Sequence, residues 1–291
     1  MGNFQEQELK DTVLYSLRLP RLIVACLCGA SLSAAGVVSQ GLFRNPLACP
    51  SVLGASSGGV LGVILIYFFF SPWQHWFAIP LGAVLTTALT MFLLLKLFRS
   101  LSSQQSSQLL LCGFALTTLL AAFSSLLMSF LLTQMEKTMS LMQWMMGGFS
   151  GRGWEHVFLG LPLVLLGICL AFLQTAKLDM LTFGEELASS MNLDVNKLQK
   201  LSVFSIACLV GASVSVAGTL PFVSLIVPHF TRKFTGAAQR FLLPCSILNG
   251  MILLIVGDFL AQRLFYPKEM ELGIFTSLLG GIFFLSKILR S

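Results

Sequence analysis

Charged side chains are scarce in this sequence. They make up 10% of the 291 residues, whereas 56% of the residues are apolar. Water-soluble domains carry about 25% charged residues, so this balance excludes a soluble fold and indicates that most of the surface faces lipid. The net charge of +6 is then first an orientation signal for a membrane protein, and we expect no nucleic-acid partner.

A secretory leader is also missing. The first residues carry Glu6, Glu8, Lys10 and Asp11, and they lack the positively charged start and apolar core of a signal peptide. We therefore expect residues 1–21 to form a polar amino-terminal segment. Insertion into the bilayer should rely on the membrane helices themselves.

Cysteine and histidine do not form metal-binding or catalytic patterns. The seven cysteines are scattered and lie mostly inside apolar runs, which is typical of small packing residues. The three histidines, His75, His156 and His229, fall in different loops or helix ends. We expect no metal site and no disulfide framework.

The phosphate-binding pattern G-x-x-x-x-G-K followed by Ser or Thr is absent, so we expect ATP and Mg to be used by a partner subunit and no cofactor to bind this chain. Gly54-Ala-Ser56-Ser-Gly58 matches the G-x-S-x-G pattern of hydrolases, but it opens an apolar helix where a hydrolase would have a preceding strand. We do not expect an enzyme. A membrane enzyme is an alternative that a cluster of serine, histidine and acid would favour.

Apolar runs long enough to cross the bilayer occur eight times, since a spanning helix needs about 20 mostly apolar residues. They are Leu22–Gln40, Val52–Phe70, Trp76–Leu97, Leu109–Leu132, Val157–Leu173, Leu201–Ala217, Leu242–Ala261 and Gly273–Leu289. A ninth run, Phe222–His229, is too short to cross alone and predicts a buried half-helix. The predicted fold class is all-α: a polytopic membrane protein with about nine membrane segments, forming one domain over residues 1–291.

The distribution of basic residues predicts an orientation. With nine segments and the carboxyl terminus inside, eleven of the 18 lysines and arginines lie inside. Small residues recur at four-residue spacing within several runs, which is typical of close helix packing in membranes. These stripes are Ala30 with Ala34, Gly54 with Gly58 and Gly62, and Gly211 with Ser215.

The longest polar stretch inside the chain is Lys177–Lys200. Thr182 and Glu185 have the spacing of a capping box, which predicts the start of a short helix. Asn192 tolerates the left-handed conformation that ends many helices, and Asp194 can cap the next helix. The stretch 177–200 therefore predicts a compact helical hairpin on the cytoplasmic face.

Titratable side chains inside the apolar runs are few. Asp258 is the one acidic residue there, and Lys96 lies at a helix end. Proton- and ion-coupled transporters need buried titratable groups along their path, so the sequence disfavours a stand-alone secondary transporter. That class stays the alternative, and buried titratable pairs would favour it.

Short motifs follow one another along the chain: Arg18-Leu-Pro-Arg21, Arg44-Asn-Pro-Leu-Ala48, Leu53-Gly-Ala-Ser-Ser-Gly58, Gly184-Glu-Glu186 and Pro228-His-Phe-Thr-Arg232. In this order they resemble the FecCD-type permeases, the family of iron-chelate, haem and cobalamin importers. The resemblance runs from Arg18 to Leu289. Some motif residues have no assigned contact with a partner and are expected to shape the structure. They are Arg44, Asn45, Pro46, Gly54, Pro228, His229, Arg232 and Asp258.

The resemblance implies a membrane subunit that forms a homodimer, pairs with two ATP-binding subunits and receives substrate from an extracytoplasmic binding protein. It assigns coupling to the ATPase to Gly184, Glu185, Glu186, Ala188 and Asn192. It assigns docking of the binding protein to Arg18, Arg21 and Arg263. The implied location is the inner or plasma membrane of a prokaryote, as a multi-pass protein.

We rank a ferric siderophore or similar iron chelate first as substrate, then haem, then cobalamin, with oxyanions last. The chain departs from the family pattern at Asn192, where a glycine is usual, and at Glu271 and Ile282, where prolines are common. Members of the family usually carry a further helix before the motif that begins at Arg18.

Overall fold

The computed structural model describes residues 13–69, 78–100, 106–131, 135–264 and 269–288, and within these ranges the chain is entirely helical apart from its connections. A five-residue π-helix, η1 (Leu14–Arg18), leads directly into the first long helix. The α-helices are α2 (Leu19–Leu42), α3 (Ala55–Phe69), α4 (Ala78–Ser100), α5 (Ser106–Leu131), α6 (Met135–Met145), α7 (Trp154–Leu181), α8 (Glu185–Ser190), α9 (Val195–Ala217), α10 (Val223–Thr235), α11 (Gln239–Leu264) and α12 (Leu272–Ile288).

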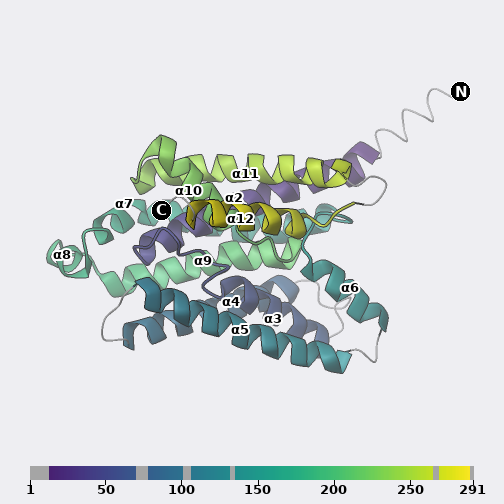
Figure 1. Ribbon diagram of the computed structural model, residues 1–291, viewed down its shortest axis with the longest axis horizontal. Helices are drawn as coiled ribbons and strands as arrows, with labels where there is room; N and C mark the ends of the chain where they lie inside the picture. Colours follow the sequence, from purple (N-terminus) through teal and green to yellow (C-terminus); the bar gives the residue numbers. More distant parts are fainter. Residues whose placement is uncertain (1–12, 70–77, 101–105, 132–134, 265–268, 289–291) are drawn as a thin grey trace, which may run out of the picture.

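The long helices lie roughly along one axis, with α8 at one end of the bundle and α6 at the other (Figure 1). Among the described residues, six helices are long and apolar enough to cross a membrane. They begin at Leu14 (with η1 joined to α2), Ala78, Gln108, Trp154, Val195 and Gln239. The shorter apolar helices α3 and α12 account for the other two predicted runs, so each predicted run falls on a helix.

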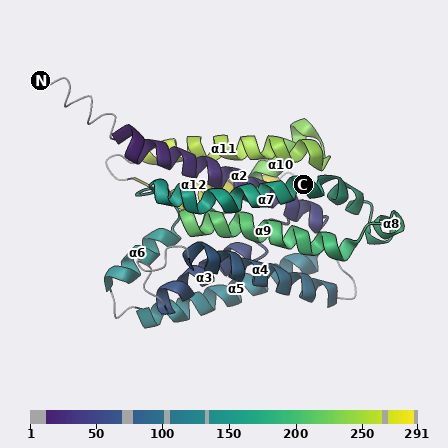
Figure 2. The same cartoon turned by 180° about the vertical axis from the view of Figure 1, so that it is seen from behind.

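Helix α9 occupies the centre of the bundle. It packs against α7, which runs beside it (Figure 2), and against α2, α3 and α4. Close approach depends on glycine: a Cβ added at Gly211 would lie 2.7 Å from Val84 Cα on α4, and one added at Gly29 of α2 would lie 2.3 Å from the Gly250 carbonyl of α11. The predicted small-residue packing is confirmed at Gly211, and at Gly62, where an added Cβ would meet the Gly82 carbonyl at 2.4 Å.

The predicted buried half-helix exists as α10, but it is longer than predicted. Helix α10 has 13 residues and runs six residues beyond His229, to Thr235. At 1.5 Å per residue it is about 20 Å long, which is less than the hydrocarbon core. Phe222 precedes it in the left-handed conformation (φ 64°), and a Cβ at Gly36 would lie 2.0 Å from the Ser224 carbonyl, so α10 lies directly against α2.

Two predicted boundaries are wrong. Helical structure starts at Leu14, inside the supposed polar segment 1–21, and α7 continues eight residues past Leu173. Both extensions carry polar side chains, which end a run of hydropathy without ending a helix. The predicted hairpin 177–200 consequently contains the last turn of α7 and the first turns of α9, and its separate helix is α8 alone.

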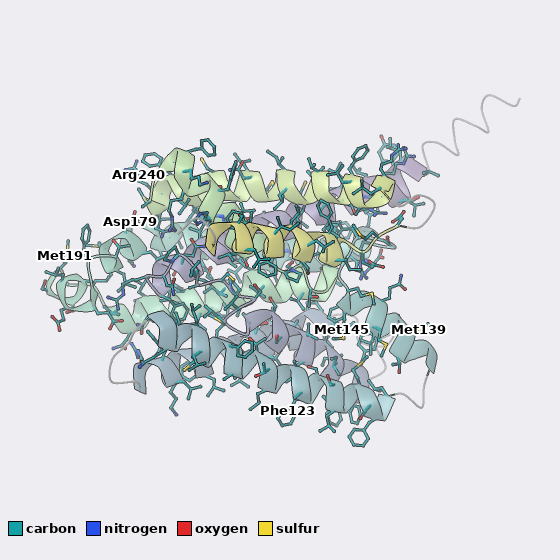
Figure 3. All side chains as sticks on the ribbon, in the orientation of Figure 1. Phe123, Met139, Met145, Asp179, Met191 and Arg240 are labelled. Atoms are coloured by element: carbon teal, nitrogen blue, oxygen red, sulfur yellow. The ribbon has the colours of Figure 1, made fainter. Side chains whose placement is uncertain are left out.

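Side chains on the outside of the bundle are largely apolar. Phe123 on α5 points away from the bundle, and Asp179, Met191 and Arg240 gather at the α8 end (Figure 3). Met139 and Met145 lie toward the opposite end. Only 22% of the membrane window of α5 is buried within the chain. This face requires lipid or another protein against it.

Candidate functional site

The connection from α7 to α8 does not form the predicted capping box. Thr182 Oγ1 donates to the Asp179 carbonyl at 2.6 Å, so the side chain of Thr182 bonds back to its own helix. The residue that precedes α8 is Gly184, with φ 110°, and no side chain caps the helix there. The predicted short helix exists, but α8 starts at Glu185, two residues later than a cap at Thr182 would place it, after a turn that favours glycine.

The end of α8 follows the prediction. Asn192 takes a left-handed conformation (φ 66°), and the Leu193 amide donates to the Ala188 carbonyl at 3.1 Å. Asp194 Oδ1 accepts from the Lys197 amide at 2.9 Å and caps α9. The short helix is therefore bounded by defined turns at both ends.

Glu185 connects α8 to the rest of the bundle. Its carboxylate lies 3.8 Å from Arg44 Nη2 and accepts from Gln199 Nε2 at 3.4 Å. Gln199 in turn accepts from Arg99, which also donates to Asn196 Oδ1 at 2.5 Å. One carboxylate thus joins α8 to the loop after α2, to the start of α9 and to the end of α4.

The loop after α2 holds several of the predicted motif residues. Arg44 is left-handed (φ 51°), and Asn45 Oδ1 accepts from the Leu47 amide at 2.9 Å, which forms a turn around Pro46. Gly54, with φ 85°, ends the loop before α3. These residues shape the loop that contacts α8.

The remaining motif residues lie on α10 and α11. Arg232 Nη2 donates to Gln40 Oε1 at 2.8 Å and joins α10 to α2. Pro228 is buried, and the ring of His229 lies edge-on to Phe283 at 5.4 Å. Asp258 lies on α11, near the opposite end from α8.

A cavity of about 600 Å³ at that opposite end brings the three predicted docking residues together. Arg18, Arg21 and Arg263 line it with the acidic residues Asp258 and Glu269. Arg18 and Arg263 are exposed, and the Arg263 guanidinium lies 5.7 Å from the centre of the Phe259 ring.

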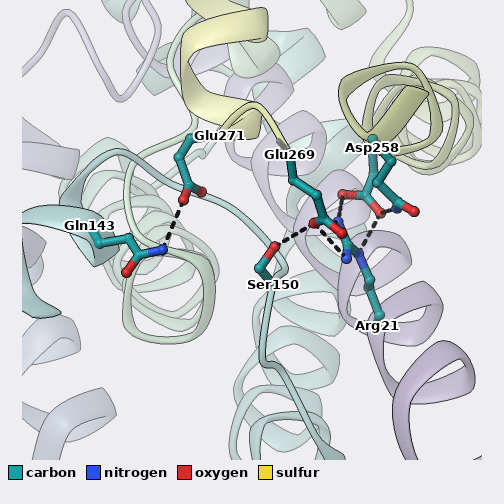
Figure 4. Close-up of polar contacts among 7 residues, drawn as sticks. Arg21, Gln143, Ser150, Asp258, Glu269 and Glu271 are labelled. Atoms are coloured by element: carbon teal, nitrogen blue, oxygen red, sulfur yellow. Dashed lines mark hydrogen bonds and ion pairs between the residues drawn. The ribbon is translucent and has the colours of Figure 1, made fainter. Parts of the chain in front are cut away.

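Arg21 is instead held by both carboxylates (Figure 4). Its Nε and Nη2 donate to Asp258 at 2.8 and 2.9 Å, and its Nη1 and Nη2 donate to Glu269 at 3.0 and 3.1 Å. Ser150 Oγ donates to Glu269 at 2.8 Å. The hydrogen bond from Ser150, together with the charge of Arg21, lowers the pKa of Glu269.

Sequence reasoning missed three residues at this end: Glu269, Ser150 and Arg152. Each lies in a connection between helices, where no hydropathy pattern or motif marks it. Arg152 also lines the 600 Å³ cavity. Among the described residues, no group of three His, Cys, Asp or Glu side chains could hold a metal ion.

Comparisons with known proteins agree with this architecture. The sequence matches the FecCD transport family over residues 1–290. The Fe(3+)-citrate import permease YfmE of Bacillus subtilis is 35% identical over 94% of this chain and 81% of its own length. The hemin transport permease HmuU of Yersinia pestis is 36% identical (94% and 82%), and the vitamin B12 import permease BtuC of Vibrio cholerae is 36% identical (97% and 84%).

A solved inward-facing structure of a metal-chelate type ABC transporter superposes with a TM-score of 0.85, at 32% identity, covering 98% of this chain and 89% of that chain. The chain belongs to the FecCD transport family, and it is a multi-pass permease of the ABC importer class in the inner membrane of a bacterium.

Proposed function

We propose that this permease forms the translocation pathway of a binding-protein-dependent importer for an iron chelate, haem or cobalamin, driven by two separate ATP-binding subunits that use ATP and Mg. The observation that carries the proposal is the position of α8. This helix, bounded by turns, lies beyond one end of the bundle, and the arginine-lined cavity lies at the other.

Helix α8 has the surface of a docking element. Phe183, Leu187 and Met191 are 70%, 58% and 54% exposed, although they lie past the end of the membrane helices. Exposed apolar side chains of this kind mark a protein contact. An ATP-binding subunit that covers them would move α8, and Glu185 would pass that movement to the loop at Arg44. Gly184, Glu186, Ala188 and Asn192 complete the coupling element.

The cavity at the opposite end suits the acidic surface of a binding protein. Arg18 and Arg263 present exposed guanidinium groups, which bind carboxylates with paired hydrogen bonds. Arg21 completes the docking group, although its side chain already contacts Asp258 and Glu269. Complementary charge steers and orients such a partner.

A homodimer explains the face of α5 that the chain leaves uncovered. Helices within one copy approach too closely to leave a channel along the bundle axis, as the contacts at Gly29 and Gly211 illustrate. A pathway between two copies needs no such channel. We propose nine crossings with α8 inside: the six long helices together with the shorter α3, α10 and α12.

The alternative of a stand-alone secondary transporter would need buried titratable groups along the path. The pair formed by Arg21 and Asp258 lies at one end of the bundle, beside the half-exposed Glu269. It provides no relay across the membrane. The similar permeases are named for Fe(3+)-citrate, hemin and vitamin B12, which supports an iron chelate, haem or cobalamin as the substrate.

The proposal is tested by uptake in cells that lack this gene. We expect the deletion to abolish ATP-dependent uptake of one labelled compound among ferric citrate, a ferric hydroxamate, haem and cobalamin, and the intact gene to restore it. Normal uptake of all four by the deletion strain would contradict the proposed substrate class.

A further inference from the structure

A second cavity, of about 370 Å³, adjoins the arginine-lined cavity and is more polar. Tyr67 from the end of α3, Gln143 from α6 and Glu271 just before α12 line it, together with Ser150 and Arg152 from the loop between α6 and α7. Figure 4 shows three of these residues: Ser150 donates to Glu269, and Glu271 accepts from Gln143. Arg152 lines both cavities.

Arg152 is half-buried and lacks a carboxylate partner within ion-pair distance among the described residues. Its Nη1 lies 3.1 Å from His156 Nε2, and its Nε is buried without a hydrogen-bond partner. Because a guanidinium only donates, Nε2 of His156 must accept. The imidazole proton is then on Nδ1, which lies 2.9 Å from Glu155 Oε1 and 3.3 Å from the Gly153 amide nitrogen. The Glu155 carboxylate accepts this proton, so the Gly153 amide does not donate to the same nitrogen. The group that holds Arg152 is therefore a neutral ring.

This arrangement leaves positive charge without a direct counter-charge. Burial lowers the pKa of Arg152, because the charged form loses water, and this effect outweighs the charges of Glu271 and Glu155, which raise the pKa. Groups of this kind are normally paired when they are buried. The fork of an arginine matches a carboxylate, which would satisfy the free Nε.

Glu271 also lines the cavity. Its Oε1 accepts from Gln143 Nε2 at 3.3 Å, and a Cβ added at Gly148 would lie 2.4 Å from its Oε2. Glycine at 148 therefore makes room for this carboxylate. The cavity lining thus offers a bound molecule a cation, a carboxylate acceptor and a side-chain amide.

We propose that this cavity is a binding site for a small carboxylate-bearing molecule, with Arg152 holding the carboxylate. If the bound molecule is the transported substrate, that assignment rests on the proposed function. A cavity of about 370 Å³ is within the usual range for small-molecule sites, about 300–1,000 Å³. The exposed Arg18 and Arg263 are better placed than Arg152 for a protein partner, because they stand at the surface.

The test is binding of radiolabelled citrate to the purified permease in nanodiscs, by equilibrium dialysis, with uncharged trimethyl citrate as competitor. We expect wild-type protein to bind citrate, trimethyl citrate not to compete, and Arg152→Gln to weaken binding by about tenfold or more, since charge-assisted hydrogen bonds are lost. Arg152→Lys should keep part of the affinity. Arg240→Gln, at the other end of the molecule, is the matched control and should leave binding unchanged.

A gain of affinity provides the second arm. Glu271→Gln removes a negative charge from the cavity and should tighten citrate binding several-fold, which a general loss of structure would not do. No citrate binding by the wild type at millimolar concentration, or equal affinity in wild type and Arg152→Gln, would overturn the site. Weaker docking of the binding protein to Arg152→Gln, with citrate affinity unchanged, would assign the carboxylate to the partner and also overturn it. Failure of the proposed function would be seen in a different measurement, the uptake assay, as uptake that does not depend on ATP.

Discussion

At the scale of single residues, Arg21 binds two carboxylates at once. Its guanidinium group donates four hydrogen bonds, two to Asp258 and two to Glu269. The contacts join α2 to α11 and to the segment before α12. Its side chain is 21% exposed and that of Asp258 is 11% exposed, so the pair is more protected than a surface ion pair.

We predict that Arg21→Gln and Asp258→Asn each lower the thermal unfolding temperature of the purified permease. A double-mutant cycle should give a coupling energy of about 1–3 kcal/mol, because a bidentate, partly buried pair is lost. Arg263→Gln is the control, and it should change stability by less than about 0.5 kcal/mol. Additive effects of the two substitutions would show that Arg21 and Asp258 do not stabilise the protein through their contact.

The same unfolding measurement has a pH dependence with a defined sign. The pKa of Glu269 is lowered from its ordinary value of 4.5 in the folded protein. Its contribution to stability is therefore complete above pH 4.5 and is lost as pH falls through the lower folded-state pKa. Glu269→Gln should remove this part of the acid dependence.

At the scale of elements, α8 should behave as a lever. Ala188 is fully buried and its amide donates to the Gly184 carbonyl at 3.0 Å, so Ala188→Pro removes a helix hydrogen bond. Glu185→Ala removes the contacts with Arg44 and Gln199 and leaves the helix intact.

Both variants should reduce uptake by about tenfold or more while ATP hydrolysis by the complex continues, since coupling energies of this kind are about 1–3 kcal/mol. Lys200→Ala, an exposed charge at the same end, is the control. The measurement is the ratio of transported substrate to ATP hydrolysed in proteoliposomes. An unchanged ratio in Ala188→Pro would show that α8 does not carry the movement.

The helices were predictable where hydropathy alone decides their extent, and less so where tertiary contacts do. The last turns of α7 contain Gln174 and Asp179, which look like the start of a loop. In the structure Gln174 accepts from Ser202 at 2.5 Å, and Asp179 accepts from the Gln239 amide at 2.9 Å. Partners distant in the sequence donate to the side-chain oxygens of both residues, so the helix continues. No local pattern contains that information.

The candidate sites divide in the same way. The family resemblance singled out Arg18, Arg21 and Arg263, and the structure brings them to one cavity. Glu269 and Arg152 could not be predicted, because their roles depend on which loops meet at that end.

At the scale of the whole molecule, the two ends of the bundle carry different chemistry. One end exposes apolar side chains on α8 and in its flanking turns, and the other exposes arginines around a cavity. Between them, α5 leaves most of its membrane window uncovered. A molecule built in this way is incomplete without other chains.

Native mass spectrometry of the complex, purified from its own membrane through a tag on this chain, tests that claim most directly. We predict a particle with two copies of this 31.7 kDa chain and two ATP-binding subunits. A stable, transport-competent particle with a single copy of the chain and no ATP-binding subunit would contradict the account.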